Sequence, residues 1–337
     1  MATDGDALSA VYDALLFDLD GTVYHGPRPI PGVAEVIRAV REAGTAVRFV
    51  TNNASKTPGD VAATLRGMDI HADTTEVSTS AQAAARVLAD RLPAGAEVVV
   101  VGAPALAAEV EGAGLRPVRE MGDGVAAVVQ GHWTETGWKH LAEGCLAIRA
   151  GALWVACNVD TTLPTERGQL PGNGAMVAAL KAATGAEPVV AGKPAAPLFH
   201  TAAESANATK PLAVGDRLDT DIAGAVTAGL DSLLVLTGVA TPATLLAAVP
   251  EERPTYVAAT LEALTQPAAD LQPGPQKGWQ VDVDNHALVV SAKGSSDAYE
   301  LLRALCHEAW QSGVTDVRPQ DDEAAAALAE LGLTRSR

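Results

Sequence analysis

Short apolar segments of strand length alternate with longer segments of helical pattern along most of this chain. This alternation is typical of βαβ units, in which helices cover a sheet of parallel strands. In a first set of units the expected strands are Asp13–Asp18, Ala46–Thr51, Pro211–Gly215 and Ser232–Leu236, and the expected helices are Gly32–Ala43, Pro58–Arg66 and one from Asp219 onward. The expected fold class is therefore α/β, with a doubly wound parallel sheet as its core.

A second alternating set interrupts the first and predicts an inserted domain. Its expected strands are Glu97–Gly102, Val125–Gln130 and Leu153–Cys157, and its expected helices are Ala81–Leu92, Thr136–Ala150 and Ala175–Thr184. Because the first set resumes after the second has ended, we predict core segments at residues 1–79 and 189–266. The inserted α/β domain is predicted to occupy residues 80–188.

The remaining C-terminal residues are predicted to form a small α/β module. Residues 267–278 contain Gln272-Pro273-Gly274-Pro275 and are typical of a linker. In residues 279–337 we expect the strands Trp279–Asp284 and His286–Ser291 joined by Asp284-Asn285, the helix Asp297–Gln311, the strand Thr315–Arg318 and a terminal helix. The module resembles a fragment of an acetyltransferase-like fold.

Length and composition limit the functions that this chain can have. Its 337 residues exceed what one hydrophobic core supports and indicate two or three domains. A net charge of −17 argues against a nucleic-acid partner or an anionic membrane surface, because both need clustered Lys and Arg. No segment approaches the roughly 18 apolar residues of a membrane span, and no signal peptide is recognisable. Three widely spaced cysteines are typical of reduced thiols, so a cytoplasmic protein is expected.

Two aspartates follow the first predicted strand and are candidates for chemistry. Asp18 and Asp20 are two residues apart, so their side chains would point the same way in an extended segment. The carboxyl ends of strands are where open α/β sheets bind ligands. One carboxylate could attack a substrate while the other moves protons, and a hard cation could hold both. The alternative is a surface loop that happens to carry Asp-x-Asp.

Three further polar segments follow apolar runs. Thr51 and Asn52 end the second predicted strand, Lys193 lies between Gly192 and Pro194, and Asp216, Asp219 and Asp221 follow Pro211–Gly215. Each has a structural alternative. Thr and Asn are good helix N-caps, a single lysine is usually a solvated surface residue, and aspartates stabilise the first turn of a helix.

Taken in order, these four segments resemble the motifs of the haloacid dehalogenase superfamily of phosphotransferases. The local sequences are similar to its NagD / p-nitrophenylphosphatase branch, which includes phosphoglycolate and glycerol-3-phosphate phosphatases. The resemblance covers roughly residues 12 to 265. It implies that the inserted domain is a large α/β cap, and that the protein is a phosphatase of a small phosphorylated metabolite.

The resemblance also implies a role for each residue of the core motifs. Asp18 corresponds to a nucleophile that forms an aspartyl-phosphate, and Asp20 to the general acid/base. Mg²⁺ is the implied cofactor, bound by the Asp18 carboxylate, the Asp20 backbone carbonyl and the Asp216 carboxylate. Asp221 would orient the waters on the metal from a second layer of contacts.

The phosphate group is expected to contact residues of two other motifs. The hydroxyl of Thr51 and the amide of Asn52 would donate to phosphoryl oxygens. Lys193 would supply a fixed positive charge that offsets the nucleophile and the phosphate.

A loop of the predicted cap is the candidate for contact with the leaving group. Asn158 and Asp160 are its polar candidates, although the segment could equally be a tight structural turn. The loop offers no clear aromatic clamp, which favours a small aliphatic leaving group over a flat ring. The expected substrate is therefore glycerol 3-phosphate, with phosphoglycolate and a nucleotide or sugar phosphate as alternatives.

The C-terminal module leaves open the hypothesis that the protein is more than a phosphatase. The module lacks a Gly-rich pyrophosphate loop before a helix, so a competent acyl-CoA site is not expected. A structural or regulatory module is expected instead, such as a homo-oligomer contact or a ligand-binding unit. The alternative is a bifunctional or regulatory protein whose module binds an acyl-CoA or another effector.

Overall fold

The computed structural model describes residues 5–165, 167–284 and 286–334. The chain divides into two compact units. One contains the residues up to 47 and those from 208 onward, and the other contains residues 48–207. The elements of each unit follow from the predicted alternation of strands and helices.

A parallel six-stranded sheet forms the core, in the order β15-β14-β13-β1-β4-β5. The strands are β1 (Ala14–Phe17), β4 (Ala46–Thr51), β5 (Val77–Thr79), β13 (Pro211–Gly215), β14 (Asp231–Val235) and β15 (Tyr256–Ala258). β1 and β13 are buried at every position, as expected for central strands that helices cover on both faces. The predicted α/β class with a parallel core sheet is confirmed.

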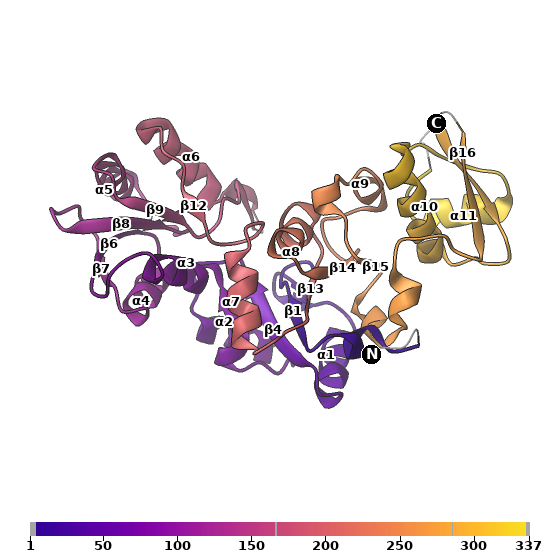
Figure 1. Ribbon diagram of the computed structural model, residues 1–337, viewed down its shortest axis with the longest axis horizontal. Coiled ribbons are helices and arrows are strands. Elements are labelled where there is room, and N and C mark those ends of the chain that lie inside the picture. The colour runs from indigo at the N-terminus through magenta and orange to yellow at the C-terminus, as the bar shows by residue number, and fades with distance from the viewer. Residues whose placement is uncertain (1–4, 166, 285, 335–337) are drawn as a thin grey trace. The chain divides into compact units, whose positions relative to one another are not determined.

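Short helices and a hairpin connect the strands of the first unit (Figure 1). They are η1 (Leu8–Val11), β2 (Tyr24–His25), β3 (Arg28–Pro29), α1 (Val33–Glu42), η3 (Leu218–Ile222), α8 (Ala223–Ala228), α9 (Pro242–Leu246), η4 (Pro250–Glu252), η5 (Leu261–Thr265) and η6 (Ala268–Leu271). The helix predicted from Asp219 begins instead with η3, a π-helical turn at Leu218. The Asp221 side chain of this turn accepts the backbone N–H groups of Asp216 and Arg217, which fixes the segment just before the turn.

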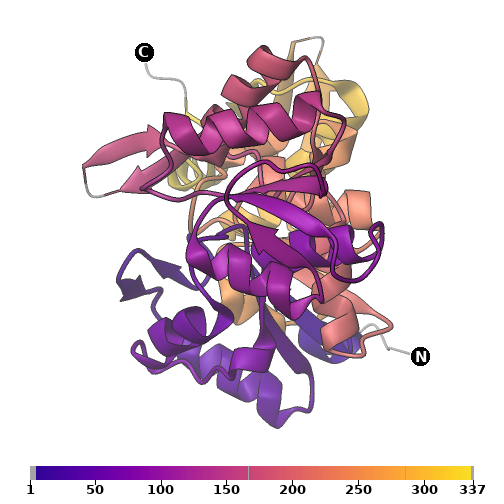
Figure 2. The ribbon, with the colours of Figure 1, turned by 90° about the vertical axis from the view of Figure 1, so that its left-hand side faces the viewer.

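The second unit contains a separate parallel sheet in the order β12-β9-β8-β6-β7. Its strands are β6 (Glu97–Val101), β7 (Arg116–Val118), β8 (Val125–Gln130), β9 (Leu153–Ala156) and β12 (Val189–Val190). The unit's helical elements are α2 (Pro58–Arg66), η2 (Thr74–Glu76), α3 (Ser80–Ala89), α4 (Pro104–Gly112), α5 (Trp138–Arg149), α6 (Asn173–Thr184) and α7 (Pro197–Ser205). Helices α5 and α6 cover one face of the sheet, and α3 and α4 cover the other (Figures 1 and 2). An inserted α/β sheet was predicted and is confirmed.

The predicted division at residues 79/80 and 188/189 stays a prediction. In the structure β5 ends at Thr79 in the core sheet, while β12 still pairs with β9. An exposed hairpin of β10 (Thr162–Thr165) and β11 (Gly168–Pro171) extends away from the five-stranded sheet (Figure 2).

The C-terminal module is a three-stranded mixed sheet with two helices. Its elements are β16 (Trp279–Asp284), β17 (Ala287–Ala292), β18 (Val317–Pro319), α10 (Ala298–Ser312) and α11 (Asp322–Glu330). β16 and β17 are antiparallel, whereas β17 and β18 are parallel. Residue 285 of the predicted turn lies outside the described residues.

The module belongs to the first unit and shares its hydrophobic core with the rest of that unit. Helix α10 contacts β16 on one side and both α9 and β15 on the other. One cluster of buried residues joins Leu245 and Val257 of the first unit to Leu301 and Leu305 of α10. The predicted linker is packed as well, since Leu271 is buried and the Gly274 N–H donates to the Arg303 carbonyl. The module therefore packs against the rest of the first unit, while the linker assignment of residues 267–278 stays a prediction.

Two other sequence-based expectations concern the cysteines and membrane segments. Cys145, Cys157 and Cys306 are free thiols. Burial raises the pKa of Cys157 and Cys306 above the usual range, so both are inert apolar residues. Among the described residues, every helix is too short or too polar to cross a bilayer.

Candidate active site

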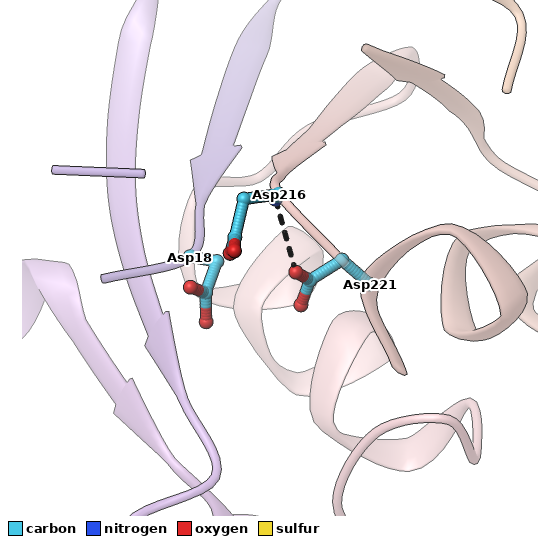
Figure 3. A group of neighbouring side chains, drawn as sticks. All are labelled: Asp18, Asp216 and Asp221. Atoms are coloured by element: carbon cyan, nitrogen blue, oxygen red, sulfur yellow. Dashed lines mark hydrogen bonds between the residues drawn. The ribbon is translucent and has the colours of Figure 1, made fainter. Parts of the chain in front are cut away.

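Two aspartates follow neighbouring strands at the carboxyl end of the core sheet. Asp18 comes directly after β1 and Asp216 directly after β13, and these strands pair in parallel. The Asp18 N–H donates to the Val214 carbonyl at 2.8 Å, which fixes the backbone at this point. Asp221 of η3 completes a group in which one carboxylate oxygen of each residue lies within 4.8 Å of the others (Figure 3). Three predicted site residues from two distant segments are thus brought together.

This carboxylate group concentrates negative charge away from water. Asp216 is 0% exposed and Asp221 is 2% exposed, whereas Asp18 is half-buried. Like charges at this separation repel each other strongly where water is scarce, so a bound cation would stabilise the group. Carboxylate oxygens are the ligands that Mg²⁺ prefers. The donor set therefore fits a hard divalent cation.

Backbone groups of a loop after β14 hold the Asp216 side chain. The N–H of Val239 donates to Asp216 Oδ2 at 2.7 Å, and the N–H of Ala240 donates to the Asp216 carbonyl at 2.9 Å. The Thr22 hydroxyl lies 3.4 Å from Asp216 Oδ1. A Cβ atom on either Gly21 or Gly238 would overlap the Asp216 carboxylate, so both positions need glycine for close approach.

Asp221 belongs to the carboxylate group and also holds the backbone that precedes it. Its Oδ2 accepts the N–H groups of Asp216 at 3.2 Å and Arg217 at 3.1 Å. Asp221 therefore fixes the backbone of Asp216 and also belongs to the same carboxylate group as the Asp216 side chain. Asp219, by contrast, is exposed and forms an ion pair with Arg217 at 2.7 Å, which agrees with a structural role.

Asp20 is not one of the three grouped carboxylates. It is exposed, and its Oδ1 accepts the Gly26 N–H at 3.4 Å at the tip of the β2–β3 hairpin. Tyr24 lies close by, where burial and the negative charges of Asp18 and Asp20 raise the pKa of its hydroxyl above the usual range. An exposed carboxylate can exchange protons with solvent, as a general acid/base must.

Lys193 and Asn52 form the centre of a second group, in the other compact unit. Lys193 is 2% exposed and its Nζ lies 3.5 Å from the Val50 carbonyl oxygen, so the surface-lysine alternative is wrong. The Asn52 side chain makes a reciprocal pair with the Lys193 backbone. Its Oδ1 accepts the Lys193 N–H at 2.8 Å and its Nδ2 donates to the Lys193 carbonyl at 3.0 Å. Asn52 therefore positions Lys193, a task that the sequence did not indicate.

The two predicted cap residues also gather around Asn52. Asn158 is buried, and its Nδ2 donates to the Asn52 carbonyl at 2.7 Å. The Ser80 hydroxyl donates to the same carbonyl at 2.6 Å. Asp160 lies 3.2 Å from Asn52 Nδ2, and the N–H of Asn53 bonds the Thr51 hydroxyl at 3.1 Å. Contact of these residues with a phosphate or a leaving group stays a prediction.

Sequence reasoning missed the loop of residues 237–241, which supplies the N–H groups on Asp216. Backbone donors carry no side-chain signature, so only the Thr237-Gly238 pair directly after a strand could have pointed to it. Gly192 also has a role that its local sequence does not indicate. In the structure a Cβ there would overlap Asn52 Oδ1, so this glycine allows the close approach of Asn52 to Lys193.

Family models match three parts of the chain. Residues 15–116 match a model of haloacid dehalogenase-like hydrolases, and residues 190–264 match a HAD-hydrolase-like model. Residues 276–333 match a GCN5-related N-acetyltransferase like domain. The first two matches contain all the predicted core motifs, and the third covers most of the C-terminal module.

Two curated proteins and one solved structure are similar over most of their length. The D-glycerol 3-phosphate phosphatase of Mycobacterium tuberculosis is 48% identical over 98% of this chain and 97% of its own. The 5'-nucleotidase YutF of Bacillus subtilis is 39% identical over 68% of this chain and 88% of its own. A crystal structure of glycerol phosphate phosphatase from Mycobacterium tuberculosis in complex with magnesium covers 98% of this chain and 100% of its own, with a TM-score of 0.94 and 48% identity.

Proposed function

The chain belongs to the haloacid dehalogenase-like hydrolases, and on that premise we propose that its substrate is glycerol 3-phosphate. The protein is a phosphatase, a metal-dependent phosphoric monoester hydrolase. The proposal of substrate is carried by one observation, namely that 48% identity extends over 98% of the chain, including the C-terminal module. The similarity to the 5'-nucleotidase covers only 68% of the chain.

In the proposed mechanism Asp18 and Asp20 divide the chemistry. The Asp18 carboxylate attacks phosphorus, a phosphorus–oxygen bond to the alcohol breaks, and an aspartyl-phosphate forms. Asp20 gives its proton to the departing alkoxide and then takes one from the water that releases phosphate. The exposure of Asp20 and the fact that it is not one of the three grouped carboxylates support this separate role. General acid–base help of this kind contributes about 10²–10⁴-fold.

The residues proposed to hold Mg²⁺ are Asp18, Asp216 and the Asp20 carbonyl, with Asp221 beside them. Bound Mg²⁺ would neutralise the charge that the carboxylates and the phosphoryl oxygens share. Asp221 also fixes the Asp216 backbone through two accepted N–H groups. Its loss should therefore disturb the orientation of Asp216 as well as the charge of the site.

The phosphoryl group is proposed to bind Thr51 and Lys193. Phosphoryl transfer is catalysed mainly by positioning and charge stabilisation, so a lysine needs a fixed place. The reciprocal Asn52–Lys193 pair and the burial of Lys193 provide that constraint. Asn52 is also proposed to donate a hydrogen bond to a phosphoryl oxygen. Asn158 and Asp160 are proposed to contact the leaving group.

A phosphate-release assay over a small panel tests the substrate. Glycerol 3-phosphate should exceed phosphoglycolate, a nucleotide 5'-monophosphate and a sugar phosphate in kcat/KM by at least about tenfold, because missing polar contacts discriminate strongly. Asp160→Asn should reduce this preference, whereas Asp123→Asn, an exposed aspartate elsewhere in the same unit, should not. A preference for phosphoglycolate or the nucleotide would reject the proposed substrate.

An effector role of the module is the second candidate, favoured by its match to an acetyltransferase-like domain. Charge in the module opposes an acyl-CoA ligand. Asp297 and Asp321 already cap the N-termini of α10 and α11, and a cavity of about 450 Å³ beside them is lined by Asp321 and Glu323. A pyrophosphate would be repelled there. We therefore expect no change in Tm with added CoA thioesters, while a rise would establish the effector role.

A cytoplasmic location and a homo-oligomer remain part of the proposal. The proposed substrate is a small metabolite, which fits a cytoplasmic enzyme. Sedimentation of the full chain would measure the oligomeric state.

A further inference from the structure

The orientation of Asp216 depends on the loop of residues 237–241. Besides the N–H groups of Val239 and Ala240 on Asp216, the Thr237 hydroxyl donates to the Gly21 carbonyl at 2.6 Å. The loop therefore ties Asp216 to the segment that follows Asp18. Any movement of this loop shifts the donors that fix the Asp216 carboxylate.

The loop leads without interruption into α9, and residues outside the phosphatase motifs fix the end of that helix. The Trp310 Nε1–H, from α10 of the C-terminal module, donates to the Leu245 carbonyl at 3.0 Å. The Arg253 guanidinium lies over the Trp310 ring, 5.3 Å from its centroid. Arg253 Nε also donates to the Ala248 carbonyl at 3.1 Å, just after α9.

Helix α9 is too short to be stable without these contacts. It has five residues, and a helix of that length does not form in water, since nucleation is unfavourable. Its buried side chains Leu245 and Leu246 belong to the cluster that contains Leu301, Leu302 and Leu305 of α10. The module therefore supplies part of the apolar surface around α9 and the hydrogen bond that fixes its C-terminal end.

We propose that Trp310 is a positioning residue for the metal site, acting through α9 and the 237–241 loop on the Asp216 carboxylate. The inference rests on the proposed function, in which Asp216 binds Mg²⁺. It gives the C-terminal module a task in catalysis that requires no ligand of its own. Trp310 contacts neither substrate nor metal in this account.

Two tryptophans of the module form a matched pair for the test. Trp279 also donates its Nε1–H to a backbone carbonyl, that of Asp297 at 3.1 Å, but this bond lies within the module. Trp310→Phe and Trp279→Phe thus remove the same kind of hydrogen bond and keep an aromatic ring. Only the first change breaks the connection to α9.

The experiment measures Mg²⁺ binding to the metal-free full chain by calorimetry, and exchange of the Val239 and Ala240 amides by hydrogen–deuterium exchange. We expect Trp310→Phe to raise the Kd for Mg²⁺ three- to tenfold and to speed exchange at both amides. Trp279→Phe should leave the Kd and the exchange rates of both amides within twofold of wild type, even if it lowers Tm as much as Trp310→Phe does. Equal Kd values for the two variants would show that Trp310 is merely structural and would overturn the inference.

A milder variant keeps the test decisive if Trp310→Phe fails to fold. Arg253→Met removes the stacked cation and the bond to Ala248 but keeps a side chain of similar length. It should raise the Kd two- to threefold, and an unchanged Kd would overturn the inference. Because these readouts need no substrate, a wild type that binds Mg²⁺ but fails to hydrolyse glycerol 3-phosphate would reject the proposed substrate alone.

Discussion

Gly238→Ala probes the geometry around Asp216 with a single methyl group. An added Cβ would lie closer than 3.0 Å to Oδ2, Cγ and Cβ of Asp216. Rotation of the carboxylate alone cannot relieve all three overlaps, so the whole side chain or the loop must move. Gly238 has no positive φ, so the alanine backbone itself is not strained there.

The expected cost follows from what that movement breaks. The Val239 N–H to Asp216 Oδ2 bond is 2.7 Å long and its acceptor is charged, and such bonds contribute about 1.5–3 kcal/mol. A displacement of about 1 Å at a site of this kind can lower the rate about 10²-fold. We therefore expect kcat/KM for phosphate release to fall about 10²-fold, which corresponds to about 2.7 kcal/mol of activation free energy. Mg²⁺ binding should weaken as well.

Gly122→Ala is the control, because a Cβ at Gly122 would meet open space and its φ is ordinary. It should keep the wild-type kcat/KM. Both variants would be compared by Tm to exclude unfolding. A Gly238→Ala protein with wild-type kcat/KM and wild-type Mg²⁺ affinity would refute the account of how Asp216 is held.

Three other perturbations test separate parts of the account. Asp18→Asn should keep the wild-type circular dichroism spectrum and lose turnover, because an amide is a poor nucleophile; activity within tenfold of wild type would exclude Asp18 as the nucleophile. Asp20→Asn should slow turnover about 10²–10⁴-fold while its Mg²⁺ Kd, measured by calorimetry, changes little; loss of metal binding would contradict its separate role. Deletion of residues 273–337 should lower Tm by more than about 4–8 °C, the shift for 1 kcal/mol in a small domain, because Leu301 and Leu305 share a core with α9; an unchanged Tm would argue against the shared core.

Much of the architecture could be predicted because local sequence determines it. Ala46–Thr51, Val125–Gln130 and Pro211–Gly215 are mainly apolar segments, and the structure has these strands at the predicted bounds. The carboxylates of Asp18 and Asp216 could be assigned to one site because parallel strands end at the same edge of a sheet.

The rest of the site depends on contacts between segments that no local pattern connects. Asn52 and Lys193 are 141 residues apart, and their reciprocal bond involves the backbone of Lys193. The bond from Trp310 to Leu245 likewise ends on a carbonyl, which every residue has. The Pro and Gly content of residues 267–278 predicts a linker, and composition gives no information on what Leu271 packs against.

The stereochemical course at phosphorus tests the central claim, hydrolysis through an aspartyl-phosphate on Asp18, most directly. The measurement follows the transfer of an isotopically chiral phosphoryl group from glycerol 3-phosphate to an acceptor alcohol in the presence of Mg²⁺. Two successive in-line displacements, first by Asp18 and then by the acceptor, predict retention of configuration. Inversion would mean a single direct displacement and would contradict a covalent intermediate on this protein.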